Sequence, residues 1–195
     1  IGLSWGQRNV QGKGYARYLP NVKTNRQAFF IQEKLSFNPI YFDVGYRKEK
    51  VEHQIQDQTF VLARNANNRK LENRDFDLTQ FYVGTGFNWG EHVHVYAKYS
   101  ESERAPEINE LYSSNPHYSV MTQEEGNQNL EKEKVKAMEL NTDFVFDQSK
   151  IQLSLYQMNF TNYVYLMHSG MAMGNRLPLK YWRQTDVKID GFEID

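Results

Sequence analysis

Several absences limit what this chain of 195 residues can be. It contains no cysteine, which excludes disulfide frameworks and thiolate metal sites. It has no run of about eighteen apolar residues, which excludes a transmembrane helix. Its formal net charge is −1 and no basic stripe is present, so we expect no nucleic-acid partner. Signatures such as G-x-S-x-G and H-E-x-x-H are missing, and nothing marks the chain as an enzyme.

Its aromatic content is high for such a polar chain. Only 39% of the residues are hydrophobic and the mean hydropathy is −0.75, yet the chain has 13 Tyr and 12 Phe. A membrane β-barrel has this composition, because its strands show every second side chain to lipid and carry aromatic girdles at both interfaces. A tyrosine-rich soluble all-β protein has it too, and composition leaves both open.

The connections between alternating stretches are short and long in turn. The short ones are expected at Asn38-Pro39, Trp89-Gly90 and Asp147-Gln148-Ser149, and the long ones at 9–25, 53–75, 105–129 and 168–178. A transmembrane barrel places tight turns on one rim and long loops on the other. The stretches 26–38, 130–146 and 150–167 span about 13 to 18 residues each, longer than usual globular strands. We therefore predict an all-β fold, an antiparallel transmembrane β-barrel segment of about eight strands, with helix confined to a turn near 106–112.

Alternation also predicts which side chains share a face. We expect an outward, lipid-facing set of Phe42, Val44, Phe81, Val83, Val93, Val95, Leu153 and Leu155. We expect a lumen-facing set of Asp43, Gln80, His94, Lys98, Asn141 and Asp143. Gly84 and Gly86 lie on a strand that no helix follows, so we expect them to admit a neighbouring side chain rather than a phosphate.

Four motifs in sequence order resemble those of TonB-dependent outer-membrane receptors. The segment 102–114 resembles the family's S-R-A-P…E-L-Y, and 125–134 resembles its G-N-P-N-L-x-P-E-K, with Gln128 and Lys132 in place of two prolines. A later strand of the family resembles the stretch from Tyr156 to Tyr165. The strand after it resembles residues 184–187 taken together with 191–193. Residues 1–79 fit by architecture alone.

The resemblance implies that 1–195 is a partial β-barrel domain from a barrel of about 22 strands. The plug and the remaining strands would lie outside this chain, which looks cut at both ends. The implied function is energised uptake of a scarce nutrient across the bacterial outer membrane, without covalent chemistry. The implied partners are the lipid bilayer, the TonB energy-coupling complex acting through the plug, and a transported metal or metal chelate.

Within the family, the loop resembles the zinc-uptake branch most. The residues that carry this resemblance are 113–117, Glu124-Glu125 and Leu177-Pro178. It implies that His117 and Glu124 are metal ligands, with zinc as the transported substrate rather than a resident cofactor. His92 and His94 lie two apart on a strand, so they share a face, but their turn belongs to the wrong rim. His53 and His168 show no partners in the sequence.

Three alternatives remain open at this point. The first is a siderophore or haem receptor of the same family; a haem receptor should show an axial histidine with aromatic walls, whereas a zinc receptor should show histidine and carboxylate converging. The second is a small eight-stranded outer-membrane adhesin or enzyme. The third is a soluble lipocalin-like barrel, which should have shorter strands and an apolar interior.

Overall fold

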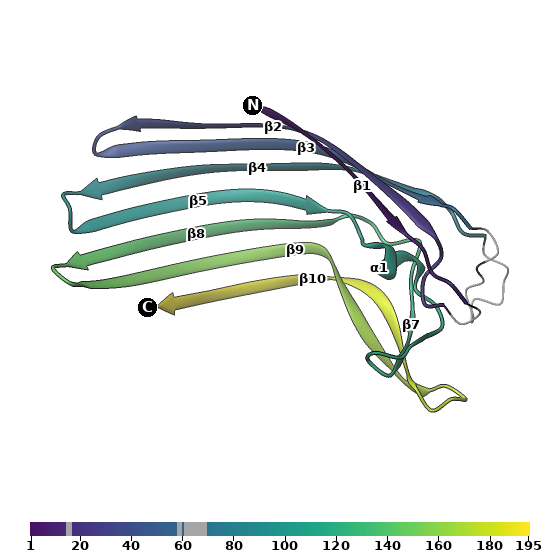
Figure 1. The fold of residues 1–195 in the computed structure, drawn as a ribbon. Helices are drawn as coiled ribbons and strands as arrows, with labels where there is room; N and C mark the ends of the chain where they lie inside the picture. Colours follow the sequence, from purple (N-terminus) through teal and green to yellow (C-terminus); the bar gives the residue numbers. More distant parts are fainter. Residues whose placement is uncertain (15–16, 58–59, 61–69) are drawn as a thin grey trace.

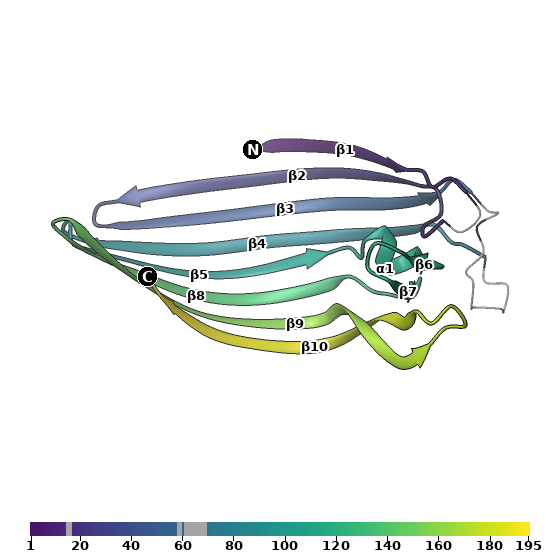
Figure 2. The same cartoon turned by 60° about the horizontal axis from the view of Figure 1, so that its bottom comes forward.

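The computed structural model describes residues 1–14, 17–57, 60 and 70–195. In these residues, ten strands form one curved, open sheet in the order β1-β2-β3-β4-β5-β8-β9-β10-β7-β6 (Figures 1 and 2). The eight long strands are β1 (Gly2–Val10), β2 (Val22–Phe37), β3 (Ile40–Ile55), β4 (Arg74–Trp89), β5 (Val93–Arg104), β8 (Glu133–Phe146), β9 (Ser149–Ala172) and β10 (Pro178–Ile194). Between β5 and β8 lie helix α1 (Ile108–Tyr112) and the short strands β6 (Pro116–His117) and β7 (Thr122–Glu125). No helix in the described residues is long and apolar enough to span a bilayer.

The predicted rims are confirmed. The tight turns between β2 and β3, β4 and β5, and β8 and β9 lie at one end, while α1, β6 and β7 lie at the other (Figure 1). Two expectations were wrong. The loop expected at 168–178 is mostly strand, because β9 and β10 continue pairing up to Ala172 and Pro178 across an irregular register. The sheet is also not purely antiparallel, because β7 pairs in parallel with β10. Part of the expected loop 53–75 lies outside the described residues.

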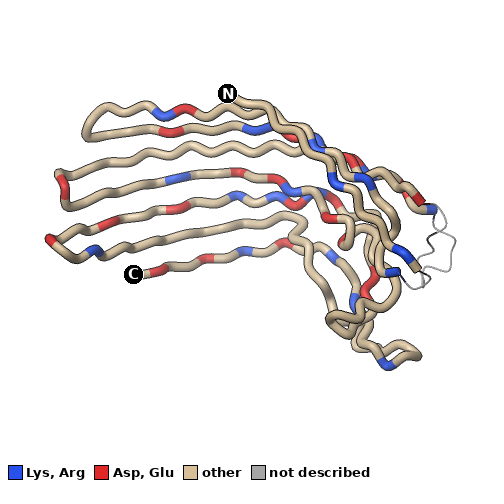
Figure 3. The backbone as a smooth tube through the Cα atoms, viewed as in Figure 1, with Lys and Arg blue, Asp and Glu red and all other residues tan. Residues whose placement is uncertain are grey.

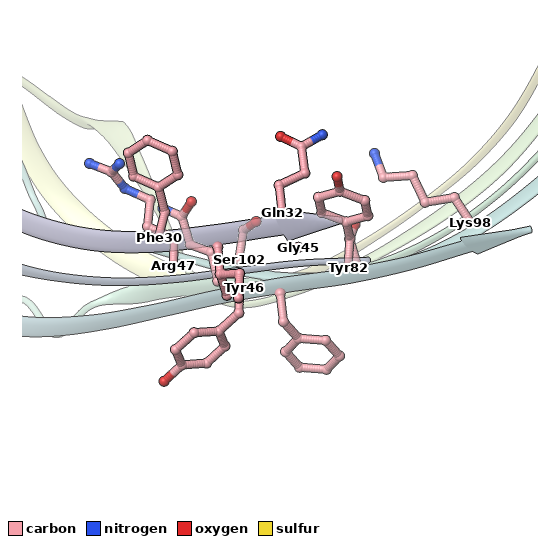
Figure 4. Close-up of a pocket in the computed structure, with 12 residues that line it drawn as sticks. Phe30, Gln32, Gly45, Tyr46, Arg47, Tyr82, Lys98 and Ser102 are labelled. Atoms are coloured by element: carbon pink, nitrogen blue, oxygen red, sulfur yellow. The ribbon is translucent and has the colours of Figure 1, made fainter. Parts of the chain in front are cut away.

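The two predicted faces are confirmed by the strand registers. Val44 pairs with Val83, and Val95 and Leu153 both pair with Thr142, so these predicted outward residues share one face of the sheet. Figure 4 shows the same division in one region: Gln32, Tyr82 and Lys98 project from one side of the sheet and Tyr46 from the other. The side that carries Gln32 and Lys98 is the inner one, because α1 packs there.

The outer apolar band ends along a slanted line. Toward the loop end, its last members are Phe29, Tyr46, Phe81, Tyr99, Met138, Leu155 and Phe192, on β2, β3, β4, β5, β8, β9 and β10 in turn. Two residues closer to the loop end, on the same outer face, each of these strands has a polar side chain: Gln27, Lys48, Thr79, Glu101, Lys136, Gln157 and Asp190. Figure 3 shows that charged residues gather toward this end.

The slope of this line measures the strand tilt. Following the registers from Phe29 to Phe192, the boundary moves by six residues over six strand spacings. Six residues correspond to about 20 Å along a strand and six spacings to about 29 Å across the sheet. The boundary is therefore inclined by about 35°, close to the strand tilt of outer-membrane barrels. A membrane plane crossing tilted strands accounts for this pattern.

Glycines on the inner face admit large neighbours, as predicted. A Cβ atom on Gly86 would overlap the Tyr41 ring, and one on Gly84 would overlap Asp43 and the Tyr96 hydroxyl. The Tyr96 hydroxyl donates hydrogen bonds to both carboxylate oxygens of Asp43, at 3.0 and 3.1 Å. The two glycines thus let tyrosines lie flat against the wall of the sheet.

The connection between β5 and β8 folds back onto the inner face at the loop end. Leu111 and Tyr112 of α1 are completely buried there, in a cluster with Val51, Phe76 and Leu78 of the sheet. The helix starts with a capping box, in which Glu107 and Glu110 each bind the other's backbone N–H. This small core fixes the base from which the β6–β7 hairpin projects.

Candidate functional site

Arg104 stabilises the connection between β5 and β8 at its neck, the place where the connection leaves β5 and enters β8. Its guanidinium binds the carboxylate of Glu133 through two parallel hydrogen bonds, and it also binds Glu110 at 2.9 Å. Arg104 and Glu133 are partners in the β5–β8 ladder, and Glu110 is in α1. A planar guanidinium suits this fork-like recognition of carboxylates. Arg104, a residue of the family-like motif, therefore links the start of this connection both to helix α1 and to the end of the connection at Glu133.

A second set of contacts ties the connection to β1, β2 and β3. Glu107 accepts hydrogen bonds from Arg8 at 2.6 Å and from Arg26 at 3.0 Å. The buried ring of His53 makes hydrogen bonds at both nitrogens: Nδ1 lies 2.9 Å from the Thr24 hydroxyl and Nε2 lies 3.1 Å from the Pro106 carbonyl oxygen. His53 had no visible partner in the sequence because Pro106 is 53 residues away.

His117 and Glu124, the two predicted metal ligands, do meet in the β6–β7 hairpin. Nδ1 of His117 lies 3.1 Å from Oε1 of Glu124. The same oxygen accepts a hydrogen bond from Thr122 at 3.0 Å, and the other oxygen accepts one from Tyr18. The Tyr18 ring also stacks on the imidazole, with centroids 4.2 Å apart. Tyr18 lies 106 residues from Glu124 in the sequence, and no sequence pattern marked it.

The hydrogen bond to Glu124 fixes the tautomer of His117. An ionised carboxylate only accepts hydrogen bonds, so in the neutral imidazole Nδ1 is the protonated nitrogen and Nε2 carries the lone pair. In the described part of the chain, Nε2 has no hydrogen-bond partner, and the side chain is 33% exposed. Such a carboxylate–histidine pair is the arrangement that orients imidazole as a metal ligand.

Tyr18 stays a neutral phenol in this cluster. Burial raises its pKa, and the hydrogen bond to Glu124 together with the charge of that carboxylate raises it further. Ser113 and Trp182 lie beside the hydroxyl and partly offset these effects. A phenol that resists ionisation is a poor anionic metal ligand, so Tyr18 acts as a donor to Glu124 and as an aromatic wall for His117.

The cluster offers one metal-binding atom rather than several. The Glu124 side chain is only 6% exposed, and its oxygens accept hydrogen bonds from Tyr18, Thr122 and His117. Among the described residues, no group of three His, Asp or Glu side chains is arranged to hold a metal ion. A structural zinc site needs about four such ligands and a catalytic one about three.

Exposed apolar side chains lie in the turn that follows His117. The turn between β6 and β7 carries Tyr118, Val120 and Met121, which are 63%, 54% and 60% exposed. The Tyr18 ring covers one face of His117. An imidazole nitrogen and exposed apolar side chains are thus found in one short hairpin.

The other histidines lie elsewhere. His94 lies on the inner face at the turn rim, where Nδ1 is 3.0 Å from the side-chain oxygen of Asn88. His92 lies in the turn before β5, so the two residues are not on one regular strand as predicted. His168 is exposed on β9 and pairs with Lys180 of β10.

Comparison with known proteins identifies the family of the chain. The family model for TonB-dependent receptor-like β-barrels matches residues 1–195. Hemoglobin-haptoglobin utilization protein B of Neisseria meningitidis serogroup C is 32% identical over 97 residues, which cover 49% of this chain and 12% of that protein. This chain thus spans about an eighth of the length of that relative.

Two solved structures share the fold. The hemophore receptor HasR of Serratia marcescens, in complex with its hemophore and heme, superposes with a TM-score of 0.75 at 12% identity, covering 98% of this chain and 35% of that one. The copper transporter OprC superposes with a TM-score of 0.73 at 17% identity, covering 89% of this chain and 26% of that one. The names of these three proteins give no support to zinc in particular. The chain is a segment of a bacterial outer-membrane barrel and belongs to the TonB-dependent receptor-like β-barrel family.

Proposed function

We propose that the intact protein is an outer-membrane receptor that takes up haem iron, and that His117 binds the iron. Residues 1–195 are then part of the barrel domain, and the plug and the remaining strands lie outside this chain. Uptake would draw energy from the TonB complex through the plug, as the family resemblance implies. The barrel exposes its outer apolar band to the lipid bilayer, and no catalytic step is required.

The orientation of His117 by Glu124 is the observation that carries this proposal. Iron in haem already has four porphyrin nitrogens and needs one or two axial ligands from the protein. One imidazole with Nδ1 held by a carboxylate and Nε2 free meets that need. The Tyr18 ring on the imidazole is the aromatic wall expected of a haem receptor, and the adjoining turn carries the exposed side chains of Tyr118, Val120 and Met121.

Zinc fits the same cluster less well. His117 and Glu124 converge, as the zinc expectation required, but Glu124 is buried and its oxygens already accept three hydrogen bonds. Zinc would therefore gain one ligand here and would need the rest from outside this chain. The names of the relatives, which refer to haemoglobin, heme or copper, also favour haem over zinc.

The test is a haem titration of the intact receptor in detergent, followed by the absorbance of the bound haem. We expect wild type to bind haem with the spectrum of an imidazole-ligated iron, and His117→Ala to bind at least about tenfold more weakly. His92→Ala is the matched control, because it removes another exposed histidine, from the turn before β5 at the opposite rim, and it should leave the spectrum unchanged. Zinc calorimetry on the same samples decides the alternative: tight zinc binding that depends on His117, without haem binding, would refute the proposal.

A further inference from the structure

The external ends of four strands form a small sheet that carries the His117 cluster. Its order is β9-β10-β7-β6. His168 pairs with Lys180, Lys180 pairs with Glu124, and Thr122 pairs with His117. Directly paired residues project to the same side of a sheet, as do residues two apart on one strand. Lys180 therefore lies on the same face as Glu124 and His117.

The ammonium group of Lys180 has no partner in the described part of the chain. It forms neither a hydrogen bond nor an ion pair, although the side chain is half-buried. Its neighbour Glu124 is engaged by Tyr18, Thr122 and His117 instead. On the same strand, by contrast, Lys188 pairs with Asp190 at 3.3 Å. A half-buried cation beside the site is thus left for an anion that the described part of this chain does not supply.

The spacing suits a ligand that extends from His117 across the sheet. β7 lies between β6 and β10, and His117 and Lys180 pair with residues two apart on it, so their backbones are two strand spacings across and two residues along the sheet, or about 12 Å, apart. The flexible four-carbon stem of lysine extends its reach from there. A porphyrin bound through its iron at Nε2 carries its carboxylates at its edge, several bonds from the metal. The ring thus bridges a gap that a bare metal ion does not.

We propose that Lys180 binds a carboxylate of the cargo held at His117, which for haem is a propionate. This inference rests on the proposed function, because it takes His117 as the iron ligand. It adds a substrate preference to that function, because the site then distinguishes a porphyrin with free carboxylates from one without them.

The experiment compares two ligands in two variants of the intact receptor. The ligands are ferric protoporphyrin IX and its dimethyl ester, which keeps the iron and the ring but lacks the negative carboxylates. The variants are Lys180→Met, which keeps the length of the side chain and removes its charge, and Lys188→Met as the matched control on the same strand. We expect Lys180→Met to weaken haem binding about tenfold, as for loss of a charge-assisted hydrogen bond. Binding of the dimethyl ester should be the same in wild type and both variants.

Two results would overturn the inference while leaving the proposed function intact. If Lys180→Met binds haem as tightly as wild type, Lys180 does not contact the cargo. If Lys180→Met weakens haem and dimethyl ester equally, Lys180 acts through Glu124 and His117 rather than on a carboxylate. Failure of the wild-type receptor to bind haem at all would overturn the proposed function and the inference with it.

Discussion

Arg104 and Glu133 face each other at the neck of the connection that carries His117, and their side chains form two parallel hydrogen bonds of 3.3 and 3.2 Å. Neither residue touches the His117 cluster. Their pairing closes the two ends of the connection, and the additional bonds from Arg104 to Glu110 fix α1 at the same point. The motif by which the sequence resembles its family thus has a mechanical role, which is to hold the hairpin in place.

Replacing Arg104 with Lys should loosen the connection without unfolding the barrel. Lysine keeps the charge but lacks the fork that binds two carboxylates. Because Arg104 is 41% exposed, we expect a local cost of about 1 kcal/mol. Hydrogen exchange should show faster opening of residues 105–132, with unchanged protection in β2 and β3. The control Arg183→Lys alters an exposed arginine at the same end, and equal exchange in both variants would show that Arg104 has no such role.

The contacts of Glu107 should make the connection sensitive to acid. Burial by itself would raise the pKa of Glu107, but Arg8 and Arg26 outweigh it and hold the pKa below its usual value. A depressed pKa means that the ion pairs stabilise the folded connection above the ordinary glutamate range of about 4.3. This stabilisation is lost as the pH falls below that range, through the lowered pKa.

The measurement is hydrogen exchange of residues 105–113 at neutral pH and near pH 3.5, corrected for intrinsic rates. Wild type should lose protection on acidification. Glu107→Gln should be less protected than wild type at neutral pH and should change little on acidification, because its side chain does not titrate. A loss of protection as large in the variant as in wild type would assign the acid response to other groups.

Spin labels at neighbouring positions test which face of β5 meets lipid. In a cysteine-free background, Val93→Cys and His94→Cys place a label on opposite faces of the strand. The label at 93 should relax with lipid-soluble oxygen, and the label at 94 with a water-soluble agent in the lumen. Because a slip of one residue inverts every side chain, the reverse pattern would contradict the assigned faces.

The parts of the structure that the sequence predicted depend on local patterns. Alternation places Val93 and His94 on opposite faces without reference to any other strand, and short breaks in the alternation such as Trp89-Gly90 mark turns by themselves. His117 and Glu124 are seven residues apart in one hairpin, so their meeting was also within reach. The end of β9 was missed because Gly170 and Pro178 read as a loop, while an irregular register lets pairing continue.

Long-range contacts lay beyond these patterns. Tyr18 reaches Glu124 across 106 residues, and His53 reaches Pro106 across 53. Both meetings depend on the connection folding inward onto the sheet, which follows from burial of Leu111 and Tyr112 rather than from any motif near Tyr18 or His53. The parallel pairing of β7 with β10 has the same origin, because it requires the hairpin to return across the mouth of the sheet.

Growth on haem as the only iron source tests the central claim most directly. The host strain should lack its own haem receptors and express the intact receptor as wild type, His117→Ala or His92→Ala at equal levels in the outer membrane. The account predicts growth with wild type and with His92→Ala, and little or no growth with His117→Ala at limiting haem, because His117 is the histidine that is held by Glu124 with a free Nε2. Growth with His117→Ala equal to growth with wild type would contradict it. A wild-type receptor that supports no growth on haem but restores growth under zinc limitation would contradict it as well.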